Sequence, residues 1–99
     1  MSTICEKLIG KAVRSVDWCN DNWGIVFSDG SGLTCYSAFE VRFSCDSEDT
    51  HVVSCNCDAE FLHLVLGNGT HVKIGAVPEA RSPEAFVYND SDGTTIVAN

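Results

Sequence analysis

The chain has few basic residues, and this shortage excludes several classes of function. It contains 6 lysines and arginines against 14 aspartates and glutamates, a formal net charge of −8. Proteins that bind nucleic acid or anionic membranes need clustered basic side chains to displace counterions. We therefore expect neither a nucleic-acid nor a membrane partner. A basic protein is the partner that this charge would attract, because opposite charge speeds encounter.

Long hydrophobic runs are also missing. No segment approaches the roughly 18 apolar residues that cross a membrane. The N-terminal "MSTICEKLIGK" lacks the basic start and apolar stretch of a signal peptide. We therefore expect a cytoplasmic protein whose six cysteines stay free thiols in a reducing compartment. These cysteines are Cys5, Cys19, Cys35, Cys45, Cys55 and Cys57.

Motifs of catalysis and of cofactor binding are absent as well. The chain has no G-x-S-x-G elbow, no phosphate loop and no H-E-x-x-H segment. The stretch "NDSDGTT" resembles a calcium loop, but the first ligand position of that loop falls on Tyr88. We expect a protein that is not an enzyme and that has no cofactor.

The cysteines and histidines offer one alternative, a metal site. Cys55-x-Cys57 and His51 share one face of an expected strand, and Cys45 precedes them. Zinc sites usually have paired Cys-x-x-Cys knuckles, and this pair is spaced too closely. We expect ordinary strand cysteines and no metal, although the sequence leaves open whether these four residues bind one. His63 and His71 are predicted to lie on the outer face of a hairpin.

Alternation of apolar and small or polar residues is the clearest positive signal. In "WGIVFSDGSGLTCYS" (23–37), a loop at residues 28–30 would pair Ile25 with Leu33 and Trp23 with Cys35. Directly opposed residues share a sheet face, so this register puts the large apolar residues on one side. A three-residue hairpin loop ends in a left-handed position that suits glycine. The Asp-Gly loop therefore predicts a turn and not a ligand site.

Two more hairpins follow from the same pattern. "FLHLVLGNGTHVKIG" has a loop at residues 67–69 that would pair Leu64 with Val72. "AFVYNDSDGTTIVAN" has a loop at residues 91–93 that would pair Tyr88 with Ile96. Three loops of one chemical type, each between strand-like residues, indicate shared turn chemistry.

An internal repeat connects the first two hairpins. Residues 13–37 lie over residues 52–76 at an offset of 39, and the inward positions match in apolar character. Repetition at a fixed period indicates a duplicated supersecondary unit. We therefore expect a single domain, residues 1–99, with a three-stranded meander in each of two units, residues 11–37 and 50–76.

The remaining segments complete an all-β fold. Thr3 and Glu6 have capping-box spacing and Gly10 follows, so residues 4–9 predict a short N-terminal helix. The alternation in residues 39–45 predicts a half-buried strand. The expected fold is all-β and mainly antiparallel, a small sandwich or partly open barrel built from the two meanders with a C-terminal hairpin.

The candidate partner-binding residues are two aromatics and two acids. By alternation, Trp18 and Tyr36 are predicted on the sheet face opposite Trp23, beside Asp17 and Asp21. Tryptophan and tyrosine are enriched in protein interfaces. Two alternatives stay open, that the terminal hairpin covers this face, and that the face forms a homodimer.

The chain also resembles a bacterial domain-of-unknown-function family. The resemblance is carried by "LIGKAVRSV" with "WGIVFSDGSGL", by "LHLVLGNGTHVKI" and by "PEAFVYNDSDGTTIV", and covers residues 8–97. Such proteins are small, β-rich and often duplicated, similar in style to immunity proteins of toxin systems and to orphans on mobile gene cassettes. The resemblance implies no catalytic residues.

Two functions are weighed on this basis. The first is a non-enzymatic binding protein that uses an acidic β-surface on a protein partner, in its concrete form an immunity protein or inhibitor of a basic toxin. The alternative is a small β-barrel that binds an apolar small molecule between its meanders. A deep apolar cavity would favour the ligand, and a packed core with an exposed patch would favour the partner.

Overall fold

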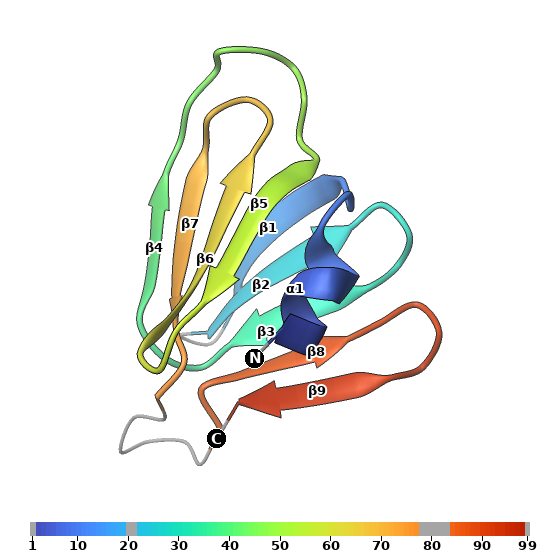
Figure 1. The fold of residues 1–99 in the computed structure, drawn as a ribbon, viewed down its shortest axis with the longest axis vertical. Coiled ribbons are helices and arrows are strands. Elements are labelled where there is room, and N and C mark those ends of the chain that lie inside the picture. Colours follow the sequence, from blue (N-terminus) through green and yellow to red (C-terminus); the bar gives the residue numbers. More distant parts are fainter. Residues whose placement is uncertain (1, 20–21, 78–83, 99) are drawn as a thin grey trace.

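A computed structural model describes residues 2–19, 22–77 and 84–98, with the backbone alone at residues 2, 3, 18 and 19. These residues form one helix and nine strands (Figure 1). The elements are α1 (Ser2–Leu8), β1 (Val13–Cys19), β2 (Asn22–Phe27), β3 (Gly32–Cys35), β4 (Phe39–Arg42), β5 (Val52–Cys57), β6 (Phe61–Leu66), β7 (His71–Gly75), β8 (Phe86–Asn89) and β9 (Thr95–Ala98).

The strands pair antiparallel in two sheets. The order is β1-β2-β3-β8-β9 in the five-stranded sheet and β4-β7-β6-β5 in the four-stranded sheet. The sheets do not close into a barrel, so each keeps its edge strands. The predicted all-β fold is confirmed, with the sandwich as its form.

The three predicted hairpin registers are confirmed. Ile25 pairs with Leu33, Leu64 pairs with Val72, and Tyr88 pairs with Ile96. The glycine that closes each loop has a positive φ, +91° at Gly30, +89° at Gly69 and +93° at Gly93. In each loop the residue before that glycine accepts a hydrogen bond through its side chain from the residue after it. These loops are turns, as the sequence indicates.

The two meanders correspond strand by strand. β1, β2 and β3 form the first, and β5, β6 and β7 form the second. Both carry a β-bulge at the same place, between Val13 and Ser15 in β1 and between Val52 and Ser54 in β5. Since bulges are specific local features, this match supports the alignment at an offset of 39 residues.

The meanders join where the first strand of each begins. Ala12 and His51 form an isolated antiparallel bridge, and the backbone N–H of Val52 donates to the carbonyl of Lys11 over 2.8 Å. Farther along, the ring of Trp23 in β2 stacks on that of Phe39 in β4 with centroids 4.8 Å apart. These contacts fix the sheets face to face, with the apolar core between them.

Helix α1 covers one opening of the sandwich; it packs against β5 and is drawn in front of β2 and β3 in Figure 1. Ile4 and Leu8 lie one helical turn apart and are both 0% exposed within the core. Burying such side chains contributes about 2–3 kcal/mol each. The helix spans Ser2–Leu8 where residues 4–9 were predicted, and it stops as expected at Gly10, whose φ is +87°.

Strand β4 is shorter than predicted. It ends at Arg42, while the alternation favoured a strand over residues 39–45. Beyond Arg42, the backbone N–H of Ser44 donates to the hydroxyl of Thr70, which donates in turn to the Ser44 carbonyl. This side-chain pairing replaces the strand ladder. Phe43 is left 77% exposed, and Cys45 is exposed.

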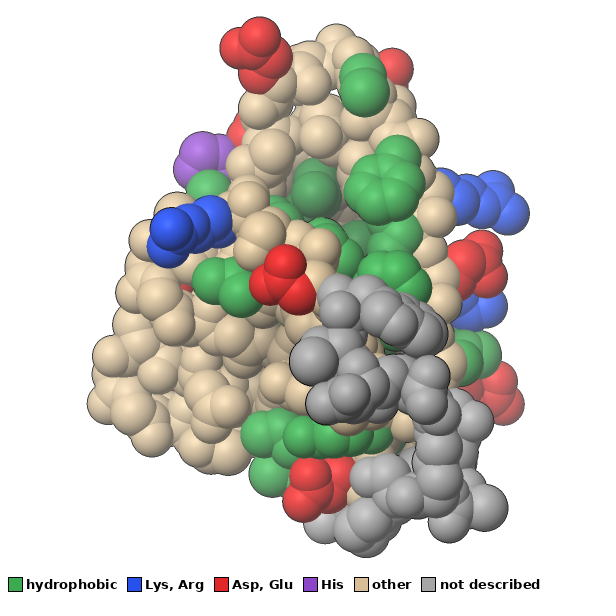
Figure 2. Space-filling model, turned by 180° about the vertical axis from the view of Figure 1, so that it is seen from behind, with side chains coloured by type: hydrophobic (Ala, Val, Ile, Leu, Met, Phe, Trp, Pro, Cys, Tyr) green, Lys and Arg blue, Asp and Glu red, His purple; other side chains and the backbone are tan. Residues whose placement is uncertain are grey.

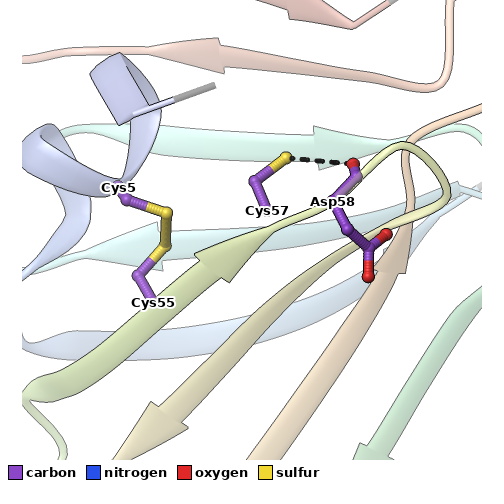
Figure 3. Close-up of a disulfide and its surroundings, with 4 residues drawn as sticks. All are labelled: Cys5, Cys55, Cys57 and Asp58. Atoms are coloured by element: carbon purple, nitrogen blue, oxygen red, sulfur yellow. Dashed lines mark hydrogen bonds between the residues drawn. A yellow bond between two sulfur atoms is a disulfide. The ribbon is translucent and has the colours of Figure 1, made fainter.

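The expectation of six free thiols is wrong for two of them. Cys5 of α1 and Cys55 of β5 form a disulfide, with their Cα atoms 5.3 Å apart (Figure 3). Packing of α1 against β5 brings these residues together, which compartment reasoning from the sequence does not detect. Among the described side chains, the free cysteines are Cys35, Cys45 and Cys57. Burial raises the pKa of the Cys35 thiol to about 12.

Candidate functional site

An apolar cavity of about 350 Å³ lies between the two sheets. Its walls come from β1 and β2 on one side and from β4, β6 and β7 on the other. The innermost residues belong to the hydrophobic core and are buried. They are Ile25, Leu64, Leu66 and Val72.

The cavity opens on the side away from α1. Figure 2 shows a hollow on this face with hydrophobic side chains gathered around it. Val16 of β1 and Val41 of β4, each half-buried, line it from the two edge strands, and the exposed Phe43 lines it beyond the end of β4. We call the cavity and this opening the groove. Toward the other end of β2 and β4, the stacked rings of Trp23 and Phe39 bridge the two sheets.

The bulge in β1 brings a charge to the groove. Arg14 is the extra residue between Val13 and Ser15, and it lines the cavity together with both. Its side chain is exposed and has no ion-pair partner in the part of the chain that the structure describes. Bulges commonly redirect a side chain next to a functional site. Arg14 is the one charged residue in the cavity lining described here.

The segment between β4 and β5 borders the groove and is held by the β6–β7 turn. Besides the Ser44 contacts, the backbone N–H of Asp46 donates to the carbonyl of Asn68 over 3.1 Å. The carboxylates of Asp46 and Asp49 lie against Gly69 and Gly67. Asp49 accepts hydrogen bonds from the backbone and from the ring of His51, which lower the pKa of that carboxyl. The segment is therefore acidic and anchored.

Two of the partner-binding residues predicted from sequence, Asp17 and Tyr36, have described side chains, and neither lines this groove. Asp17 is exposed and pairs with Gly24, on the outer face of the five-stranded sheet. Tyr36 is half-buried, and its backbone N–H donates to the carbonyl of Ala85 over 2.9 Å. Asp21 lies outside the described residues.

The predicted face of Trp18 is wrong. Trp18 is the strand partner of Trp23, and directly opposed residues belong to the same face of a sheet. The prediction carried the alternation from Trp18 to Trp23 without a break. The chain reverses between Cys19 and Asn22, so the alternation of faces does not continue from β1 into β2.

The candidate metal ligands are not assembled. Cys55 is bonded to Cys5, while Cys57 donates to the carbonyl of Asp58 over 3.7 Å (Figure 3). Within residues 2–19, 22–77 and 84–98, no three His, Cys, Asp or Glu side chains gather as metal ligands would. His63 pairs with Lys73 and His71 with Val65, in the predicted register.

Sequence reasoning missed a charged cluster that fixes the N-terminal segment to two hairpin turns. Lys11 forms ion pairs with Asp29 and with Asp90, the latter at 3.3 Å, and Lys7 contacts Asp92 at 3.0 Å. The hydrogen bond from Lys11 holds the pKa of Asp29 well below its usual range. The excess of basic residues before residue 15 against acidic turns elsewhere was the available signal.

Comparisons with known proteins add no relative. No family model, no curated protein and no solved structure matches the chain. In the part of the chain that the structure describes, no helix is long and apolar enough to cross a membrane.

Proposed function

We propose that this chain is a non-enzymatic binding protein that docks a protein partner in the groove. The observation that carries the proposal is an apolar cavity that opens between two edge strands and has an exposed phenylalanine on its rim. Large aromatic side chains around a desolvated pocket are typical centres of binding energy. Phe43 is the described residue that fits this description best.

The surface chemistry supports a basic partner. The net charge is −8, and three exposed acids, Asp46, Glu48 and Asp49, lie in the segment beside the groove. Opposite charge across an interface speeds association and disfavours wrong partners. An immunity protein or an inhibitor of a basic toxin is the concrete form of this proposal, in line with the resemblance of the sequence to small duplicated bacterial domains.

The proposal of a cytoplasmic location comes from the sequence alone. The expectation that every cysteine is a free thiol followed from this location. The Cys5–Cys55 disulfide bears against it, because cytoplasmic proteins are rarely disulfide-bonded.

The test is capture of the partner by the parent chain and by two single variants, one at the groove and one outside it. The tagged chain, Phe43→Asp and Val77→Asp are each expressed in the native host, purified gently and examined by native mass spectrometry. Val77 is a matched control, because it is 55% exposed and lies outside the groove. We expect a protein at fixed stoichiometry with the parent chain and with Val77→Asp, and its loss with Phe43→Asp. Equal capture by all three would overturn the proposal.

A small apolar ligand is a second candidate, favoured by the size of the cavity. Ligand pockets generally measure about 300–1,000 Å³, so a volume of about 350 Å³ suits a small molecule. The same native spectra test it, since a bound molecule adds a discrete mass that disappears on denaturation. Binding of the dye Nile red by the parent chain, weakened by Val41→Glu in the cavity wall, would favour this candidate.

A further inference from the structure

The groove occupies a place that the first repeat fills with a helix. The segment before β1 is α1, which crosses to the other repeat and is bonded to β5 through Cys5 and Cys55. If the second unit were built in the same way, the segment before β5 would cross to β1. At the common offset, Cys55 corresponds to Val16 of β1, and Val16 lines the cavity. The groove therefore stands where a second α1 would lie.

The apolar floor supports this correspondence. Ile25 and Leu64 are equivalent positions of the two units, both are buried, and both line the cavity. Val13 and Val52, the residues before the two bulges, are also equivalent; Val13 lines the groove, and Val52 belongs to the core on the side of α1. Equivalent valines of the two units therefore lie at the two openings of the sandwich, and α1 covers one of these openings.

The described segment before β5 does not fill the second opening. Phe43 lies before the second unit where Ile4 lies before the first, at the same offset, but Phe43 is 77% exposed whereas Ile4 is 0% exposed. The backbone around it is held elsewhere, through Ser44 and Thr70 and through Asp46 and Asn68. Within residues 2–19, 22–77 and 84–98, no segment of the chain fills the groove.

Helix α1 indicates what kind of occupant fits. It has two turns and buries an aliphatic pair one turn apart, Ile4 and Leu8. On its polar side, Lys7 reaches two carboxylates, those of Asp90 and Asp92. The segment that borders the groove likewise offers exposed carboxylates, those of Asp46, Glu48 and Asp49, outside the cavity lining. Lysines on the occupant would complement them.

We propose that the groove binds a short amphipathic helix of a partner protein, with two aliphatic side chains at positions i and i+4 and lysines or arginines beside them. This inference rests on the proposed function and names the recognition element of the partner. Helices with apolar anchors at this spacing are a known mode of recognition in hydrophobic grooves.

The test uses synthetic peptides and the full chain with its disulfide intact. The probe is a peptide of about 15 residues, long enough to hold some helix on its own, built from Ala and Lys with one Ile and one Leu at i and i+4. A second peptide replaces Ile and Leu by Ser, and a third replaces every Lys by Glu. Affinity is measured by isothermal titration calorimetry, and the site is located from methyl resonances in NMR spectra.

The expected result is specific in affinity and in place. The Ile/Leu peptide binds, the Ser peptide does not, and the Glu peptide binds about tenfold more weakly, as a few rim ion pairs would give. Methyl signals of Val16, Val41 and Val72 shift. Those of Val87 and Val97, on the outer face of the five-stranded sheet, stay in place. Phe43→Asp abolishes binding and Val77→Asp preserves it.

Other results overturn the inference in distinguishable ways. If no peptide binds but a host partner is still lost with Phe43→Asp, the helix is wrong and the proposed function stands. If no peptide binds and Phe43→Asp captures the host partner as well as the parent chain does, both the helix and the proposed function are wrong. If the Ile/Leu peptide binds Phe43→Asp equally well, or shifts methyl signals outside the groove, the assigned site is wrong.

Discussion

Ile4 and Phe43 lie at the same distance before the two repeated units, yet Ile4 is completely buried in the core and Phe43 is 77% exposed. The difference follows from what precedes each meander. A helix carries Ile4 into one opening of the sandwich, while hydrogen bonds to Thr70 hold the backbone beside Phe43 away from the other. The two units thus have equivalent strands, but a helix covers only one of the two openings.

Truncating these two residues separates their contributions to stability. Ile4→Ala leaves a cavity in the core and should lower the free energy of unfolding by about 2–5 kcal/mol. Phe43→Ala should change it by less than about 0.5 kcal/mol, because an exposed side chain loses few contacts. Urea unfolding followed by tryptophan fluorescence measures both. A large loss with Phe43→Ala would mean that Phe43 packs into the groove in solution, against the open site described above.

Reduction of the disulfide should destabilise the chain. The Cys5–Cys55 bond closes a loop with a sequence separation of 50 residues, and such cross-links contribute about 2–4 kcal/mol, mainly by restricting the unfolded state. Thermal unfolding with and without a reductant should therefore give different midpoints. In the Cys5→Ser/Cys55→Ser double variant the midpoint should already be low and should no longer respond to the reductant. An unchanged midpoint in the parent chain would show that the bond contributes nothing.

Two turn glycines should differ in their sensitivity to alanine. Both have a positive φ, so Gly30→Ala should lower the free energy of unfolding by about 1 kcal/mol through backbone strain. At Gly69 a new Cβ would in addition lie 2.7 Å from a carboxylate oxygen of Asp46 and 3.0 Å from the hydroxyl of Ser44. We expect the larger loss for Gly69→Ala. Chemical denaturation of both variants tests the order, and the reverse order would contradict the described packing of the turn.

Acid should weaken the attachment of the N-terminal segment. The pKa of Asp29 is lowered, first by its hydrogen bond with Lys11, and that of Asp92 by bonds from Thr94 and Lys7. A carboxyl with a depressed pKa in the folded state stabilises the fold above its ordinary value of 3.8, and this contribution is lost as the pH falls below that value.

The measurement is the urea midpoint between pH 7 and pH 2. The parent chain should lose stability progressively below about pH 4, the ordinary range of aspartate. Lys11→Met removes the partner of Asp29 and Asp90, so its midpoint should depend less on pH in this range. Parallel curves for the two proteins would show that the cluster does not titrate as described.

The local structure of the hairpins was predictable from sequence. The pairs Ile25–Leu33 and Leu64–Val72 follow from alternation on either side of an Asx-Gly turn, because the turn length determines the register. The repetition of the strands at an offset of 39 residues follows from the same pattern. These features depend on neighbouring residues alone.

The candidate site was not predictable in the same way. β4 pairs with β7, and β8 pairs with β3, across long stretches of chain, and no local pattern encodes which edges remain open. The sequence pattern predicts Phe43 as the next inward residue of a strand. Only the hydroxyl of Thr70, 26 residues beyond Ser44, interrupts that strand. The pairing of Cys5 with Cys55 likewise depends on where α1 docks.

The single covered opening has a consequence for how this protein can change over generations. The helical cover is held by a covalent bond, two ion-paired lysines and two core residues, so most substitutions in it endanger folding. The segment beside the groove carries little of that burden, and its exposed side chains from Phe43 to Asp49 are replaceable at small cost in stability. The segment before β1 thus maintains the scaffold, while the exposed side chains of the segment before β5 can change without loss of the core.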